Sequence, residues 1–261
     1  TTLPMLDADF LTAAAKRLLD LTREVNNGQF LTVAESSGQY YIDPTRTKDY
    51  EQDIRTYAKS ISRDTLQRYL NEMTTRALEL ESVAPVQENR LWEYAIMWPE
   101  RNVQRPGWLF FGFPSQRTTA QPPKDFYTFF LPSKRITGRE DPCPDNVDEI
   151  YCFLLYFPPS KADSDLAFKN SDDAKDTYLD TLQYYAAARE LAANSGGQDK
   201  TAYSGEAKKK LDGGLVAQFN EQSGRWMSVR FNGIQRTFEQ WIAEQAPALQ
   251  TSPFRTRLDA L

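Results

Sequence analysis

The stretch that decides the fold runs from residue 105 to residue 132 and reads RPGWLFFGFPSQRTTAQPPKDFYTFFLP. Two short aromatic runs, Trp108 to Phe113 and Phe126 to Leu131, lie at its ends, and each is bounded by Pro or Gly. Runs of this length and composition are typical of buried strands. The polar connection between them, Pro114 to Asp125, contains three prolines, which cannot donate to a sheet ladder. We therefore expect two core strands joined by an ordered loop.

This connecting loop is longer than most, and ordered loops of such length are often functional. Its side chains include donors that suit an anion or another protein, which indicates binding more than catalysis: Gln116, Arg117, Thr118, Thr119, Gln121 and Lys124. Two more apolar runs, Leu91 to Trp98 and Ile150 to Phe157, flank the stretch. Because all four runs are nearly continuously apolar, we expect one central sheet that is covered on both faces.

The first part of the chain has a different pattern. Apolar residues recur at helical spacing from Asp7 or Asp9 to about Val25. A hairpin over residues 30–42 follows, and then a helical region that starts at Asp49 and is interrupted near Asp64, which can cap the next helix. A helix followed by a hairpin is typical of the recognition helix and wing of a winged-helix domain. A structural α/β unit fits the same pattern, because the first helix has few basic residues.

The fold class predicted from these patterns is α+β. Residues 1–86 form a helix-hairpin-helix part, winged-helix-like in its order of elements, and residues 87–245 form a mixed central sheet flanked by helices. The second part contains a helix from Ser171 or Asp172, a helix interrupted at Gly213-Gly214, a strand over 226–231 and a short helix over 238–242. Residues 246–261, which end in TSPFRTRLDAL, are expected to be a linker or tail.

The composition excludes several classes of function. The 261 residues include no histidine, which removes Ser-His-Asp and Cys-His catalysis and the commonest ligand of zinc. Neither G-x-x-x-x-G-K-[ST] nor G-x-G-x-x-G occurs, and no apolar run approaches the ~20 residues of a transmembrane helix. We therefore expect a chain that is not itself an enzyme, with no metal, cofactor, small-molecule substrate or membrane partner.

The two cysteines, Cys143 and Cys152, can in principle pair with each other. Cys152 lies inside an apolar run, however, which favours a buried thiol. This use of cysteine, together with the absence of a signal peptide at the start of the sequence, indicates a cytoplasmic location.

Positive charge gathers in the middle of an acidic chain. The net charge is −5, yet residues 89–139 contain eight Lys and Arg against three acids, a net charge of +5. Such a region favours an anionic partner, and a solvated rim around an aromatic core is the alternative. Arginine suits phosphate because its planar fork makes two charge-assisted hydrogen bonds. The contact surface for nucleic acid or a partner protein is predicted at Arg101, Arg105, Arg117, Lys124, Arg135 and Arg139.

Several segments together resemble a known family. They are GQFLTVAESSGQYYIDPTRTKDYEQDI, the aromatic stretch quoted above, VDEIYCFLL, YYAAARELAANSGG and TAYSGEA, in this order between Phe10 and Ile242. The combination resembles the region after the ATPase module in large P-loop ATPases of bacterial phage defence, those of BREX and phage-growth-limitation systems. The resemblance implies an internal, non-catalytic piece that binds DNA or other defence subunits and couples them to the ATPase. ATP and Mg²⁺ would then be bound elsewhere in the parent protein.

Two other functions are compatible with the residues. In the first, the proline loop and the acidic helices make a protein-interaction scaffold that binds no nucleic acid. In the second, Asp125, Asp148 and Glu149 at strand ends hold a metal ion in a carboxylate-based nuclease. If exposed, Trp98 or Trp108 can stack on a base, although their place in apolar runs favours the core for both.

Overall fold

The structure is a computed structural model that describes residues 8–25, 31–33, 39–42, 48–86, 90–98, 101–116, 122–132, 152–156, 178–231 and 234–260. The chain divides into two compact units. Unit 1 comprises Thr1–Ile61 and Gln183–Gly213, and unit 2 comprises Ser62–Leu182 and Gly214–Leu261. Unit 1 combines helices with a two-stranded sheet and unit 2 combines helices with a six-stranded sheet, which confirms the predicted α+β class.

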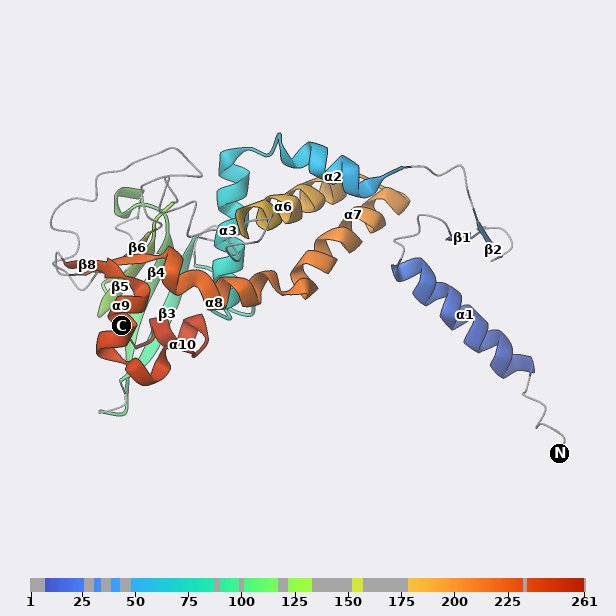
Figure 1. The fold of residues 1–261 in the computed structure, drawn as a ribbon. Coiled ribbons are helices and arrows are strands. Elements are labelled where there is room, and N and C mark those ends of the chain that lie inside the picture. The colour runs from blue at the N-terminus through green and yellow to red at the C-terminus, as the bar shows by residue number, and fades with distance from the viewer. Residues whose placement is uncertain are drawn as a thin grey trace, which may run out of the picture. The chain divides into compact units, whose positions relative to one another are not determined.

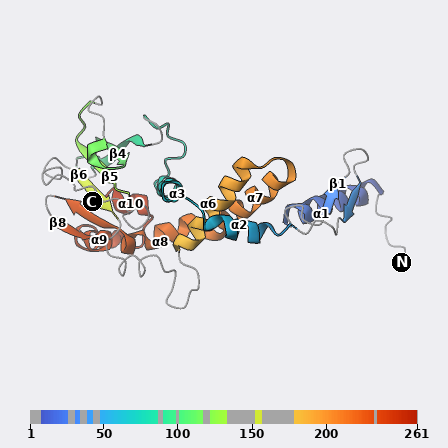
Figure 2. The same ribbon diagram turned by 90° about the horizontal axis from the view of Figure 1, so that it is seen from above.

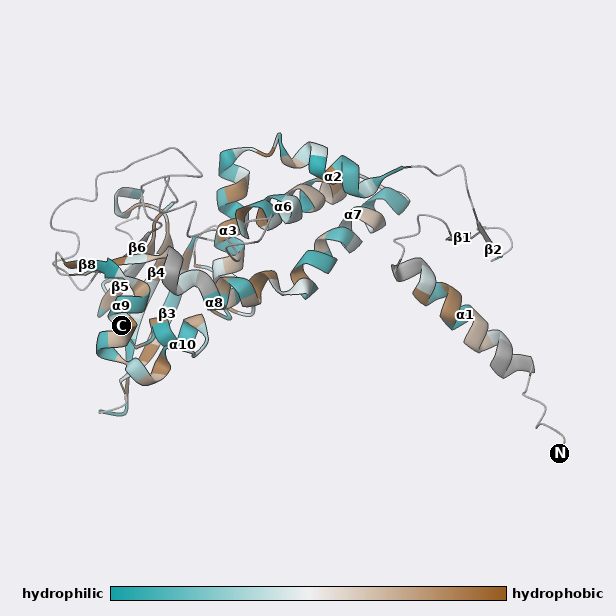
Figure 3. Ribbon diagram, viewed as in Figure 1, coloured by the Kyte–Doolittle hydropathy of each residue, from teal (hydrophilic) through white to brown (hydrophobic). Residues whose placement is uncertain are grey.

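Unit 1 begins with the predicted helix, hairpin and helix (Figure 1). Its elements are α1 (Ala8–Val25), β1 (Leu31–Val33), β2 (Tyr40–Ile42), α2 (Tyr50–Ala58), the later part of α6 (Tyr178–Asn194) and α7 (Gly197–Lys210). Strands β1 and β2 are antiparallel, and the Tyr40 hydroxyl donates to the Asp20 carboxylate of α1. Hydrophilic and hydrophobic residues both occur along the coloured part of α1 (Figure 3). Leu18 of this helix is 67% exposed. The winged-helix interpretation stays a prediction, since helix and hairpin occur together in many folds.

Helices α2, α6 and α7 lie side by side in both views of the ribbon (Figure 2). Asp49 caps α2 as predicted, because its side chain accepts from the Gln52 amide at 3.0 Å. The rings of Tyr50 and Tyr203 meet edge to face with centroids 5.2 Å apart. The Gln183 amide donates to the last carbonyl of α2, that of Ala58, at 2.7 Å.

Unit 2 is built on a mixed sheet of strand order β3-β4-β5-β6-β7-β8. Its strands are β3 (Leu91–Trp98), β4 (Val103–Phe111), β5 (Phe126–Phe130), β6 (Cys152–Tyr156), β7 (Ser228–Phe231) and β8 (Ile234–Thr237). The two central pairings, β4 with β5 and β5 with β6, are parallel and the outer pairings are antiparallel. The mixed central sheet is therefore confirmed.

The register separates the two faces of this sheet. Alternation places Leu91, Trp108, Phe110, Tyr127 and Phe129 on one face, where they form a buried aromatic cluster. The opposite face carries Trp92, Tyr94, Phe111 and Phe130. The ring of Phe130 lies 6.3 Å from that of Phe254 in a C-terminal helix, so helices cover this second face.

The remaining helices of unit 2 are α3 (Arg63–Ala77), α8 (Val216–Trp226), α9 (Phe238–Gln245) and α10 (Phe254–Leu258). Short turns, η1 (Pro114–Gln116), η3 (Leu211–Leu215) and η4 (Pro247–Leu249), lie in the connections. The break predicted at Gly213-Gly214 is confirmed, because Gly214 has φ +97° in the kink before α8. The cap of α3 differs from the prediction: Ser62, not Asp64, accepts from the Thr65 amide.

The boundaries of the parts also differ from the prediction of 1–86, 87–245 and 246–261. The unit boundary falls after Ile61, and unit 1 is completed by residues 183–213. The expected tail is wrong as well, because Phe254 is fully buried against Phe219 and Phe238 and belongs to unit 2. Strand β8 was not predicted, since its sequence IQRT is polar. The start predicted for α6 and the residue Cys143 lie outside the described residues, as does the side chain of Cys152.

We expect Phe254→Ala to lower the free energy of unfolding of unit 2 by about 3–5 kcal/mol, because it leaves a cavity among buried rings. Urea unfolding followed by circular dichroism measures the change. Thr256→Ala, an exposed change in the same helix, is the control and should alter stability by less than about 0.5 kcal/mol. Equal stability of the Phe254 variant and the parent would show that the C-terminal segment is a tail after all.

Gly107→Ala should also destabilise unit 2, by about 1–3 kcal/mol, through overpacking. An added Cβ would come within 2.5 Å of three ring atoms of Phe126, its buried neighbour on β5. Gly213→Ala is the matched control, because a Cβ there meets nothing within 4 Å. Thermal unfolding of both variants tests this packing, and a Gly107 variant as stable as the control would contradict it.

Candidate functional site

The outer half of the β3–β4 hairpin extends past the sheet. Strand β4 pairs with β5 only from Gly107 onward, so residues 103–106 pair with β3 alone. Burial changes at the same point: residues 103–106 are exposed, whereas residues 107–111 are buried. We call residues 95–98 and 101–106 the arm; these ends of β3 and β4 lie at the lower left in Figure 1.

Both faces of the arm are open. Trp98 pairs with Val103, so these two side chains share one face with Arg105. Met97 pairs with Gln104 and lies on the other face. Met97 is 51% exposed and Val103 50% exposed, so neither side chain is packed in the core. The arm therefore offers an apolar and cationic surface on a two-stranded ribbon.

Two arginines converge on Trp98. The guanidinium carbon of Arg101, from the turn, lies 4.6 Å from the centre of the indole, and that of Arg105 lies 5.1 Å away. Cation–π pairs of this kind contribute about 0.5–1 kcal/mol at exposed sites. Arg105 also forms an ion pair with Asp125 at 3.1 Å. Among the described residues Arg101 makes no ion pair, so its charge is the more available of the two.

The predicted contact residues are thus only partly brought together. Arg101 and Arg105 share Trp98, but Lys124 lies on the opposite face, where its ammonium is 5.0 Å from the ring centre of Trp108. Lys124 is also paired with Glu93 at 3.2 Å. The other three predicted residues, Arg117, Arg135 and Arg139, lie outside the described residues.

The two tryptophans considered for stacking differ. Trp108 is 2% exposed and donates its indole N–H to the Pro122 carbonyl at 2.9 Å, which confirms its place in the core. The core assignment of Trp98 is wrong, because this residue is only partly buried. The apolar sequence of β3 continues past the point at which the core ends, so the pattern alone gives no signal of the change.

The carboxylates of the predicted metal site are not assembled in the described part of the chain. Asp125 is engaged by Arg105, while Asp148 and Glu149 lie outside the described residues. No group of three or more potential ligands occurs among the described residues. None of the described helices combines the length and apolar character needed to cross a bilayer.

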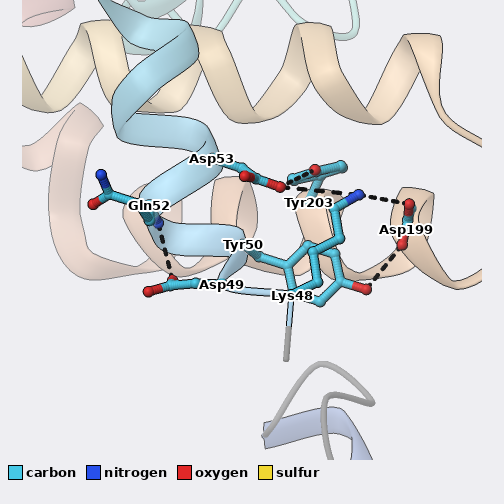
Figure 4. Close-up of polar contacts among 7 residues, drawn as sticks. All are labelled: Lys48, Asp49, Tyr50, Gln52, Asp53, Asp199 and Tyr203. Atoms are coloured by element: carbon cyan, nitrogen blue, oxygen red, sulfur yellow. Dashed lines mark hydrogen bonds and ion pairs between the residues drawn. The ribbon is translucent and has the colours of Figure 1, made fainter. Parts of the chain in front are cut away.

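A second polar cluster joins the start of α2 to the start of α7 within unit 1 (Figure 4). The ammonium of Lys48 contacts Asp199 at 2.7 Å and Asp53 at 3.9 Å, and the Tyr50 hydroxyl donates to Asp199 at 2.9 Å. The hydrogen bond to Asp199 is the main reason why the pKa of Lys48 lies well above its usual value. Burial raises the pKa of Tyr203, which donates to Asp53 at 3.1 Å. No local pattern predicts this cluster, since Tyr50 and Asp199 are 149 residues apart.

Comparison with models of protein families identifies the family of this chain. Residues 52–259 match the family described as the DUF6079 third domain. The chain belongs to the DUF6079 family. The matched region contains the arm, Asp199 and the buried Phe254 of this DUF6079 domain, whereas α1 and the β1–β2 hairpin precede it. No curated protein and no solved structure matches the chain.

We expect Asp199→Asn to reduce the stability of unit 1 by no more than about 1 kcal/mol, because Lys48 is 42% exposed and solvent screens the pair. The pKa of Lys48 is raised in the folded state, so this contribution is present at neutral pH and is lost only as strong alkali deprotonates the ammonium. Chemical unfolding at low and high salt, at neutral pH, measures the difference. A loss that is unaffected by salt would contradict an ionic origin.

Proposed function

We propose that this DUF6079 domain is a non-catalytic internal module of a large P-loop ATPase of bacterial phage defence, of the BREX and phage-growth-limitation kind. In this proposal the chain works in the cytoplasm, binds DNA through the arm, and couples that contact to ATP hydrolysis elsewhere in the parent protein. The observation that carries the proposal is the open ribbon on which Arg101 and Arg105 flank a partly exposed Trp98.

The arm has the elements that nucleic-acid contacts need. Guanidinium groups make paired hydrogen bonds to phosphate oxygens, and an exposed aromatic ring supplies a stacking surface. The family description names a third domain, which agrees with a module of a larger protein. We include Arg117, Lys124, Arg135 and Arg139 with Arg101 and Arg105 in the proposed contact surface.

A protein-interaction scaffold is the second candidate, and one observation favours it. Met97 and Val103 expose about half of their surface, so each face of the arm offers an apolar side chain that a protein partner could cover. Other defence subunits would then be the partners. Binding of that kind need not weaken steeply with salt, whereas binding to DNA phosphates does.

Titration of the purified chain into labelled DNA across a salt series separates the two candidates. We expect Arg101→Glu to weaken binding about tenfold at low salt. The slope of the logarithm of affinity against the logarithm of salt concentration should fall by about one to two released counterions. Arg63→Glu is the matched control, because it makes the same charge change at an exposed residue of α3 outside the arm. If Arg63→Glu weakens binding as much, the arm is not the contact surface. If the parent chain binds no DNA at low salt, the scaffold becomes the better proposal.

A further inference from the structure

We infer that the arm binds an unpaired nucleic-acid strand, with a base stacked at the cation–π pair of Trp98 and Arg101. This inference rests on the proposed function, since it names the form of nucleic acid that the same site takes. It depends on three observations about the arm: how Trp98 is held, how Arg101 lies against it, and how the other described cations of the predicted surface are paired.

Trp98 differs from the tryptophans that stabilise the fold of unit 2. Trp92 and Trp108 are at most 4% exposed, and the indole N–H of Trp241 donates to the Val229 carbonyl at 3.2 Å. Trp98 of β3 pairs with Val103, in the part of β4 that precedes the pairing with β5, and its ring lies against the guanidinium groups of Arg101 and Arg105. A large aromatic ring in this position contributes little to the core and is available to a ligand.

Arg101 lies over the ring of Trp98. Its guanidinium carbon lies 4.6 Å from the centre of the indole, and its side chain is exposed. A guanidinium is planar, and unpaired bases stack on arginine planes as well as on aromatic rings. A base stacked on the Arg101 guanidinium, next to Trp98, would also bring its phosphate near the cationic edge of Arg101.

The number of available cations and the need of stacking for an open base face together distinguish an unpaired strand from a duplex as the ligand of the arm. Binding to duplex DNA without sequence preference depends on many phosphate contacts. In the described part of the predicted surface, Arg105 is paired with Asp125 and Lys124 with Glu93, which leaves Arg101 as the cation without a carboxylate partner. Stacking on an aromatic ring contributes about 1–3 kcal/mol per base and requires a base whose face is not covered by its neighbours, as in an unpaired strand. The arm is therefore better suited to an unpaired base than to the backbone of a duplex.

The test compares a labelled oligodeoxythymidine strand with the duplex that it forms with oligodeoxyadenosine, both titrated with the full chain at low salt. We expect the single strand to bind more tightly. Trp98→Val, which keeps a strand-forming residue, should weaken single-strand binding at least about fivefold and leave duplex binding unchanged. Trp98→Phe should retain most of the affinity because it keeps an aromatic ring, and Trp241→Phe serves as the control at a tryptophan outside the arm.

Arg101→Lys keeps the inference testable if a Trp98 variant fails to fold. It retains the charge of an exposed residue and removes the planar group, so single-strand affinity should fall while the salt dependence stays the same. Equal binding of both DNA forms, unaffected by Trp98→Val and Arg101→Lys but weakened by Arg101→Glu, would overturn the stacking inference and leave the proposed DNA module standing. Failure of the chain to bind either form would overturn both.

Discussion

Unit 2 depends on one aromatic side chain near the end of the chain. The ring of Phe254 lies within 6.3 Å of Phe130, Phe219 and Phe238, so one residue joins β5, α8 and α9. Polar contacts fix the same helix, because the Asn220 side chain accepts from the Phe254 amide and the buried Arg257 donates to the Asn220 carbonyl. Burial lowers the pKa of Arg257, and the ring of Phe238 beneath its guanidinium offsets part of that cost.

The packed sheet and helices of unit 2 support the arm. Strand β4 is divided at Gly107, where the Phe126 ring lies against the backbone: the part after Gly107 is buried in the sheet and the part before it is exposed. The buried half fixes the direction of the β3–β4 ribbon, and the exposed arm carries Trp98 of β3, Arg101 of the turn and Arg105 of β4. Side chains held on such a supported element keep their mutual positions better than side chains on a free loop.

Local patterns predicted the elements of the fold and some of the site. The aromatic runs gave β3 to β6, and Asp49 gave the start of α2, because each depends on neighbours in sequence. Phe254 was missed because it lies alone among polar residues, and its burial depends on rings more than a dozen residues away. Arg101 and Arg105 were predicted as contact residues, but their convergence on Trp98 depends on the register of two strands.

Unit 1 consists of two separate stretches of sequence, and this division affects how the unit folds during synthesis on the ribosome. A ribosome releases α2 long before residues 183–213, which supply α7 and most of α6. Tyr50 and Ile54 are buried in the finished unit. Their side chains therefore stay uncovered while more than a hundred further residues are synthesised. Contacts between such distant segments form slowly. Helix α2 of the nascent chain is thus uncovered for this time. Pauses in translation would prolong its exposure, and chaperones would shield it.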